Sequence, residues 1–179
     1  MSGICIPDYC FSSYRDLTID FIKEHSVLAV LLDIDNTLIP YEEDVPTEEL
    51  YSWFQTLRDN GVRIAFISNN NKKRVEKFNE NLGYVAYASS LKPFKRNIVK
   101  ALRALNVGKE NAVFMGDQIW TDVLGAHNAG LPVIIVPPIR DKQDIFTKIK
   151  RYLEKPFLRK FRKEHPDSYE CEIWTRWKL

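Results

Sequence analysis

The 179-residue sequence contains few of the residues that build disulfide-stapled or zinc-stapled proteins. Its three cysteines, Cys5, Cys10 and Cys171, are an odd number without a Cys-x-x-Cys spacing, and there are only three histidines. Neither a disulfide framework nor a zinc site is therefore predicted. The longest apolar stretches, at 27–32 and 133–139, fall far short of the ~20 residues that a membrane-spanning helix needs. We expect no membrane span.

A secretory signal is also missing. The N-terminal sequence MSGICIPDYC lacks a basic start, an apolar run and a small-residue cleavage site. We expect a cytoplasmic protein whose contact with a membrane, if any, is peripheral and at the inner face. The net charge is +2, but residues 148–165 hold eight basic and two acidic residues. An acidic body therefore carries a basic C-terminal segment.

The hydrophobic pattern predicts an α/β fold. Five short apolar runs rich in β-branched residues, at 27–32, 62–67, 85–88, 112–115 and 133–136, predict buried strands. Apolar residues three and four positions apart predict helices between them, as at Leu50, Trp53, Phe54 and Leu57. Strands that are apolar on both faces indicate a Rossmann-like, central parallel sheet with helices on both faces.

The pattern also predicts how the chain is divided. We expect one domain over residues 1–155, with an N-terminal helix at about 13–25 and a C-terminal helix at 141–153 that Pro156 ends. Residues 156–179 form a basic and aromatic C-terminal extension in this interpretation. The chain is of a length typical of one ordinary domain.

In parallel sheets, ligands bind at the carboxyl ends of the strands, and the first predicted strand runs into two carboxylates there. Asp33 and Asp35 follow it, with Thr37 two residues further on. Carboxylates that lie close together repel unless they share a cation or one is protonated. Mg²⁺, which prefers oxygen ligands, is the cation we expect. An ordinary turn is the alternative interpretation of these residues.

Polar residues follow the second and third strands as well. Ser68 and Asn69 come after the second strand, where a hydroxyl and backbone N–H groups can hold phosphate oxygens. A helix N-cap is the alternative for this segment. Lys92 follows the third strand and supplies a positive charge there. The proline after it restricts the direction of the backbone at this point.

The fourth strand opens into Gly116, Asp117 and, five residues later, Asp122. Gly116 permits a tight exit, Asp117 is placed for the metal, and Asp122 is placed to orient a metal-bound water or Lys92. An acidic helix N-terminus would also explain the two aspartates. The four groups of polar residues follow four successive predicted strands in chain order, which is unlike a chance arrangement.

These motifs resemble those of the haloacid dehalogenase-like (HAD) phosphohydrolase superfamily. The first motif corresponds to Asp33-x-Asp35-x-Thr37, the second to Ser68, the third to Lys92 and the fourth to Gly116-Asp117-x-x-x-x-Asp122. More narrowly, LLDIDNTLIPYEE, SNNNKKRV, KPF and GDQIWTDVLGAHNAG resemble the YqeG-like branch of subfamily IIIA. The resemblance covers about residues 7–153.

The resemblance implies a mechanism and a role for each motif. It implies that Asp33 is the nucleophile that forms an aspartyl-phosphate, and that Asp35 is the general acid and base. Ser68, Asn69 and Lys92 would bind phosphate. It implies Mg²⁺ as cofactor, held by the carboxylates of Asp33 and Asp117 and the backbone carbonyl of Asp35. The supporting residues would be Thr37, Gly116 and Asp122.

The spacing of the motifs predicts a capless enzyme. Many HAD enzymes carry a cap domain between the first and second motifs or between the second and third. Here the residues between Thr37 and Ser68, and between Ser68 and Lys92, leave room for only one helix and one strand. An open site excludes water poorly around a small substrate, but it admits a phosphate attached to a lipid surface, a protein or a nucleic acid.

The YqeG-like branch includes phosphatidylglycerophosphate phosphatases, so the resemblance implies a phospholipid phosphate as substrate. The basic segment could contact anionic headgroups, with apolar residues at the interface. The candidates for that interface are Phe157, Leu158, Phe161, Trp174 and Trp177. The alternative is that these side chains pack against the domain. A phosphoprotein or a nucleic acid is also open as substrate, although no nucleic-acid-binding module accompanies the basic cluster.

Two readings from other classes remain as alternatives. A signalling receiver domain also has a phosphorylatable aspartate and a Lys-Pro pair, but its acceptor aspartate lies after the third strand. A non-catalytic scaffold with the same fold is the other alternative, and the complete motif set argues against it. The sequence does not indicate an oligomeric state.

Overall fold

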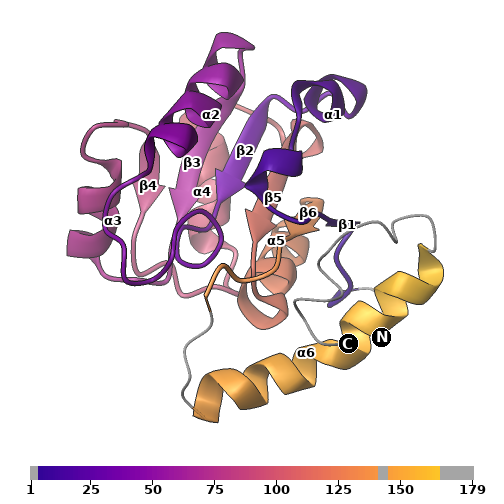
Figure 1. The fold of residues 1–179 in the computed structure, drawn as a ribbon. Helices are drawn as coiled ribbons and strands as arrows, with labels where there is room; N and C mark the ends of the chain where they lie inside the picture. The colour runs from indigo at the N-terminus through magenta and orange to yellow at the C-terminus, as the bar shows by residue number, and fades with distance from the viewer. Residues whose placement is uncertain (1–3, 141–144, 166–179) are drawn as a thin grey trace.

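A computed structural model describes residues 4–140 and 145–165 and has one six-stranded, fully parallel sheet (Figure 1). The strand order is β1-β6-β5-β2-β3-β4. The strands are β1 Tyr9–Cys10, β2 Ala29–Leu32, β3 Arg63–Ile67, β4 Val85–Tyr87, β5 Ala112–Gly116 and β6 Val133–Ile135. The five predicted strands are confirmed. The sequence pattern missed β1, because a two-residue strand has no measurable periodicity.

Helices cover both faces of the sheet, as predicted. They are α1 Ile19–Glu24, α2 Glu48–Asp59, α3 Lys72–Asn79, α4 Arg96–Leu105, α5 Leu124–Ala129 and α6 Ile145–Glu164. Shorter helical turns are η1 Tyr14–Asp16, η2 Lys109–Asn111 and the π-helical η3 Ile119–Val123. Side-chain caps set where α2 and α3 begin, because Thr47 and Asn71 accept hydrogen bonds from the backbone N–H groups of Leu50 and Arg74.

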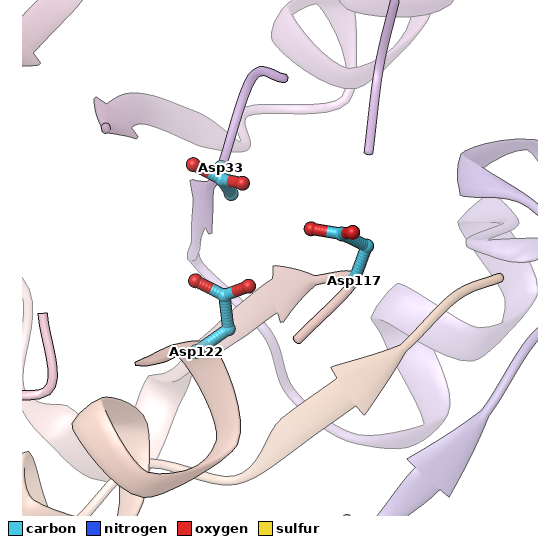
Figure 2. A group of neighbouring side chains, drawn as sticks. All are labelled: Asp33, Asp117 and Asp122. Atoms are coloured by element: carbon cyan, nitrogen blue, oxygen red, sulfur yellow. The ribbon is translucent and has the colours of Figure 1, made fainter. Parts of the chain in front are cut away.

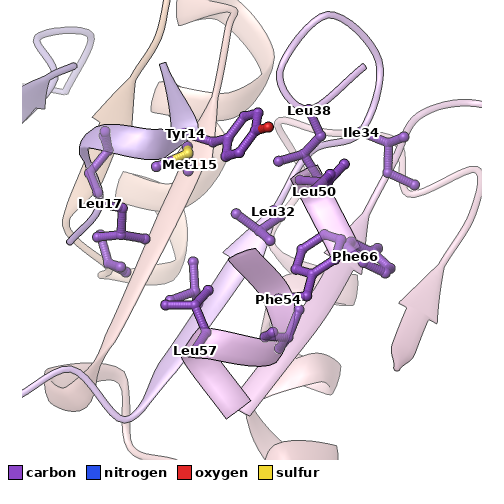
Figure 3. Close-up of a cluster of buried hydrophobic side chains, with 14 of the residues drawn as sticks. Tyr14, Leu17, Leu32, Ile34, Leu38, Leu50, Phe54, Leu57, Phe66 and Met115 are labelled. Atoms are coloured by element: carbon purple, nitrogen blue, oxygen red, sulfur yellow. The ribbon is translucent and has the colours of Figure 1, made fainter. Parts of the chain in front are cut away.

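Alternate residues of β2 enter two separate hydrophobic cores. Val30 and Leu32 pack in the core beneath α1, α2 and α3, part of which Figure 3 shows. Ala29 and Leu31 pack in the core beneath α4, α5 and α6. All four side chains are fully buried, and a buried side chain of the size of Leu stabilises the fold by about 1.5–3 kcal/mol. The central strand, which carries Asp33 at its end, is therefore held from both faces.

The prediction of one N-terminal helix over residues 13–25 is wrong in detail. The chain forms η1 and then α1, and Leu17 and Thr18 separate them. Each piece has its own cap: Ser13 caps η1, and the Thr18 hydroxyl accepts a hydrogen bond from the backbone N–H of Phe21 at 3.2 Å. Thr18 has extended backbone angles, which end the first turn before the second begins.

The prediction that Pro156 ends the last helix is also wrong. Helix α6 continues through Pro156 to Glu164. A proline inside a helix costs about 3 kcal/mol, but the turns that follow it bury Leu158 and Phe161 completely in the core. Burial of two large side chains offsets that cost. The helix crosses the expected boundary at 155–156, and residues 166–179 of the expected extension lie outside the described residues.

The same turns correct the expected lipid-facing residues. Leu158 and Phe161 are buried, and Phe157 packs edge-on against Trp120 with ring centroids 5.3 Å apart. Leu158 and Phe161 therefore belong to the domain core and cannot meet a lipid surface, and Phe157 is partly buried against that core. Trp174 and Trp177 of the same prediction lie outside the described residues, as does Cys171.

The absence of a cap domain is confirmed where it was predicted. Between β2 and β3 the chain forms only a loop and α2, and between β3 and β4 it forms only α3. Among the described residues, no helix combines the length and the apolarity that crossing a membrane requires.

The edge strand β1 is attached by an ion pair that sequence reasoning did not predict. His127 of α5 contacts the carboxylate of Asp8 at 2.9 Å and the backbone carbonyl of Ile4 at 2.7 Å. The hydrogen bond with Asp8 raises the pKa of His127. Burial works against the charge of Asp8, but hydrogen bonds from His127 and Val133 lower the pKa of Asp8 overall.

We expect Asp8→Asn to destabilise the protein most between about pH 4 and about pH 6.5, where both partners are charged. The raised pKa of His127 means that its contribution is complete below its unfolded-state pKa and is lost as the pH rises through its folded-state pKa. The lowered pKa of Asp8 means that its contribution is lost as the pH falls. Urea unfolding across this pH range measures the difference, with the exposed Asp59→Asn as control. An equal loss at pH 5 and pH 9 would contradict the ion pair.

Candidate active site

The sheet topology places a cleft at the carboxyl end of β2. From the centre of the sheet the chain proceeds outward to β3 and β4, and then returns to the other side of β2 with β5 and β6. Ligand sites in parallel sheets lie at such a reversal of strand order. A cleft of about 340 Å³ opens there, lined by residues that follow β2, β3, β4 and β5 and by residues of α6.

Three buried aspartates meet beside this cleft (Figure 2). Asp33 directly follows β2, Asp117 directly follows β5, and Asp122 lies on η3. One carboxylate oxygen from each lies within 4.8 Å of the others. Asp33 is 84 residues before Asp117 and 89 before Asp122 in the sequence, and the parallel pairing of β2 with β5 brings it to them.

The buried amine of Lys92 neutralises part of this acidic cluster. Its Nζ lies 2.7 Å from Asp33 Oδ1 and 2.7 Å from Asp122 Oδ1. Burial by itself works against the charged amine, but the two carboxylates raise the pKa of Lys92 above the ordinary lysine value. Asn69 holds the backbone of Lys92, because its side-chain amide accepts from the Lys92 N–H at 2.7 Å and donates to the Lys92 carbonyl at 3.2 Å.

Lys92 does not neutralise the whole acidic cluster, as the pKa values of Asp33 and Asp117 indicate. Burial raises the pKa of Asp33 well above its usual range; Lys92 opposes this rise, and Asp122 and Asp117 add to it. Burial likewise raises the pKa of Asp117 to about 6, against the opposing charge of Arg151. A further cation at this position would favour the ionised carboxylates.

The donor atoms fit such a cation. Asp117 Oδ1 is buried and has no hydrogen-bond partner, although a buried carboxylate oxygen normally has one. The cluster offers only oxygen ligands, which suit Mg²⁺ or Ca²⁺ rather than zinc. Asp33, Asp117 and Asp122 are therefore the side chains that could hold a divalent ion here.

Gly116 lets Asp122 approach the end of β5. A Cβ atom added at Gly116 would lie 2.4 Å from Asp122 Cγ, closer than unbonded carbon atoms come. Asp122 Oδ2 also accepts a hydrogen bond from the backbone N–H of Gln118 at 3.0 Å. The glycine therefore provides space for an aspartate, in addition to the tight exit that the sequence predicted.

Asp35 lies apart from the acidic cluster, although it lines the same cleft. Its Oδ1 accepts hydrogen bonds from the guanidinium of Arg74 at 2.9 and 3.1 Å, and its Oδ2 accepts from Asn70 Nδ2 at 3.1 Å. Strand β2 ends at Leu32, so the alternation of a strand does not extend to Asp33 and Asp35. Arg74 and Asn70 were missed in the sequence, because the neighbouring lysines and asparagines look the same.

The other predicted residues are placed as follows. Ser68 is buried at the end of β3, lines the cleft and accepts a hydrogen bond from the Asn70 N–H at 3.0 Å. Asn69 also lines the cleft, with its side chain on Lys92. Thr37 is buried, but it lines a neighbouring hollow. The phosphate-binding and supporting roles of these residues stay predictions.

Helix α6 forms one wall of the cleft, which the sequence did not indicate. Arg151 donates to the Asp117 carbonyl at 2.6 Å, to the Asp117 carboxylate and to Glu154 Oε2 at 3.1 Å. Glu154 is fully buried and accepts from the backbone N–H of Ile119 at 2.9 Å. Burial raises the pKa of Glu154 to about 7. A charged residue in a basic helix gives no sequence signal that it turns inward.

We expect Lys92→Met to lower the free energy of unfolding by about 3–5 kcal/mol, because it leaves two buried carboxylates without their cation. Adding Asp122→Asn to this variant should restore part of the loss, since one of the two charges is then gone. Denaturant unfolding measures both values. The exposed Lys95→Met serves as control and should change stability by less than about 0.5 kcal/mol. A double variant no more stable than Lys92→Met would contradict the charge pairing.

Comparisons with known proteins agree with this geometry. The model of the haloacid dehalogenase-like hydrolase family matches residues 23–130. The chain is 32% identical to the "Probable phosphatase YqeG" of Bacillus subtilis over 86% of this chain and 89% of that protein. It is 26% identical to the "Glyceraldehyde 3-phosphate phosphatase" of Pyrococcus abyssi, over 60% of this chain and 48% of that protein.

The fold has a solved counterpart. The crystal structure of CbbY from Rhodobacter sphaeroides in complex with phosphate superposes with a TM-score of 0.51 over 67% of this chain and 90% of that chain, at 16% sequence identity. This likeness concerns the fold alone. The matched family model covers more than half of the chain and includes all four motifs. The chain therefore belongs to the haloacid dehalogenase-like hydrolases and is a phosphatase of that family.

Proposed function

We propose that the chain is a Mg²⁺-dependent phosphomonoester hydrolase that acts through an aspartyl-phosphate on Asp33. The preferred substrate in this proposal is a phospholipid phosphate such as phosphatidylglycerophosphate. The observation that carries the proposal is the acidic cluster of Asp33, Asp117 and Asp122 around the amine of Lys92, at the wall of an open polar cleft.

The first chemical step requires an ionised Asp33 and a neutralised phosphate. A carboxylate oxygen of Asp33 attacks phosphorus, the P–O bond to the leaving alcohol breaks, and Asp35 donates its proton to that oxygen. Lys92 keeps positive charge beside the nucleophile. Arg74 and Asn70 hold the side chain of Asp35 in place at the cleft, where it must carry a proton before this step and is a carboxylate after it. Phosphoryl transfer depends mainly on such positioning and charge neutralisation.

The second step releases phosphate. Asp35 accepts a proton from a water molecule, whose oxygen attacks phosphorus, and the bond between phosphorus and Asp33 breaks. Asp33, Asp117 and the backbone carbonyl of Asp35 are the groups that we propose hold Mg²⁺. When bound, the ion supplies positive charge that neutralises the phosphate and favours the ionised carboxylates. Ser68 is the proposed hydroxyl ligand for a phosphate oxygen.

An open cleft supports a large substrate. No domain is inserted in the described loops that follow β2 and β3, so those loops leave the cleft accessible to a phosphate on a surface. The lining from α6 adds Thr147, Lys150 and Arg151 to a site that already holds Lys92. Lys92 and Arg151 already pair with carboxylates, whereas Lys150 contacts the neutral side chain of Gln118. Positive charge at Lys150 suits a substrate with negative charge beyond the phosphate that is cleaved. Similarity to the YqeG-like branch supports phosphatidylglycerophosphate among such substrates.

We expect Asp33→Asn to reduce phosphate release by about three orders of magnitude or more, because the amide cannot act as the nucleophile. The measurement is phosphate release from phosphatidylglycerophosphate, sugar phosphates, nucleotides and phosphopeptides. Asp59→Asn, an exposed change on α2, is the matched control. Release by a folded Asp33→Asn at the wild-type rate would refute the mechanism. A preference for a soluble sugar phosphate would overturn the lipid assignment and keep the phosphatase.

We expect Mg²⁺ to raise the melting temperature of the wild-type protein and not that of Asp117→Asn, which loses a charged ligand oxygen. A ligand at ten times its Kd stabilises the folded state by about 1.4 kcal/mol, which corresponds to about 3–5 °C for a domain of this size. Thermal unfolding with 10 mM MgCl₂ or with EDTA measures the shift. The Asp59→Asn control should keep it. An equal shift in Asp117→Asn would contradict the proposed metal site.

A further inference from the structure

Most of the exposed large apolar side chains lie on segments that follow a strand, toward the carboxyl ends of the strands, where the cleft is. Tyr41 lines the cleft itself, and Leu91 and Phe94 flank Lys92. Three more lie on α6. In the described part of the chain, only Ile4 and Leu28 of this group precede a strand and so lie at the opposite edge. Exposed apolar residues that gather on one face mark an interaction surface.

Helix α6 has an outer apolar face. Ile149, Tyr152 and Leu153 are three and four positions apart, which places them on one side of the helix, and they are 52%, 70% and 51% exposed. The opposite side holds Glu154, Leu158 and Phe161, which are buried in the domain. Helix α6 therefore packs with one face and presents a second apolar face outward.

Basic residues surround this outer face. The described helix carries eight lysine or arginine residues and two glutamates, a surplus of six positive charges. Lys148, Lys150, Arg159 and Lys163 are exposed. An apolar stripe flanked by lysines and arginines is the composition of helices that lie in the interface of an anionic membrane. A protein partner of ordinary composition would not need such a charge surplus.

The position of α6 connects this face with the cleft. Thr147, Lys150 and Arg151 line the cleft, one to six residues from the three exposed apolar side chains. Figure 1 shows α6 beside the end of the sheet toward which the strands point. A bilayer on the outer face of α6 would therefore lie next to the mouth of the cleft, where lipid headgroups are.

We propose that Ile149, Tyr152 and Leu153 of α6, with the flanking basic side chains, form a docking surface for an anionic lipid bilayer. This inference rests on the proposed function, because it gives that function's lipid substrate a route to the cleft. It replaces three residues that the sequence suggested for this contact: Leu158 and Phe161, which are buried, and Phe157, which packs against Trp120. In this proposal the outer face of α6 binds the bilayer, and the cleft binds the phosphate of the substrate.

The test is sedimentation of the 179-residue chain with vesicles of phosphatidylglycerol and phosphatidylcholine, or of phosphatidylcholine alone. We expect the wild type to bind the anionic vesicles at least tenfold more tightly. Ile149→Asn with Leu153→Asn should weaken binding to anionic vesicles at least tenfold. Leu28→Asn is the matched control, because Leu28 is also 52% exposed and lies at the opposite edge of the sheet. It should bind as the wild type does.

A second variant protects the test against misfolding. Tyr152→Ser changes the most exposed of the three side chains, and circular dichroism melting checks that each variant is folded. Equal binding by wild type, the double variant and Leu28→Asn would overturn the proposal. So would sedimentation velocity that shows a wild-type dimer and a monomeric double variant, since the face would then pair with a second copy.

The vesicle experiment also separates the two proposals. Binding needs no turnover, so Asp33→Asn should bind anionic vesicles as the wild type does. If the wild type releases phosphate from a soluble ester but does not bind anionic vesicles, the docking surface is refuted and the phosphatase stands. If it binds but releases no phosphate from any ester, the proposed function fails and the docking surface stands.

Discussion

The contact between the buried amine of Lys92 and the carboxylates of Asp33 and Asp122 is the interaction on which the site depends. Three carboxylates within 4.8 Å of one another would repel strongly in a buried position. One lysine offsets part of that repulsion, and Asn69 holds its backbone. The remaining negative charge would favour a divalent cation at this position.

Helix α6 extends this electrostatic arrangement beyond the part of the chain that matches the family model, which ends at residue 130. Arg151 binds both the carbonyl and the carboxylate of Asp117, and Glu154 binds the first turn of η3. The helix thus contacts the end of β5 through Arg151 and exposes other residues at the surface of the molecule. A capless enzyme gains in this way a wall for its cleft without an inserted domain.

Several features could be predicted because their causes are local. The strand at 29–32 is apolar on both faces, and the residues after it are polar, so a sheet edge with Asp33 follows from the pattern. Asp35 lines the cleft, and its predicted catalytic role stays a prediction, but its binding to Arg74 was not predictable. That ion pair requires α3 to meet the turn after β2, and no periodicity of the sequence encodes such a meeting.

The sequence by itself determined five of the six strands of the described chain, the helices between them, the absence of a cap, the family, and the residues that follow each of those five strands. These depend on local hydrophobicity and on motif spacing. Only the tertiary structure decided that Arg74 binds Asp35, that α6 continues through Pro156 and that Glu154 turns inward. The physical reason is that burial and charge pairing between distant segments outweigh the local preference of a proline or a glutamate.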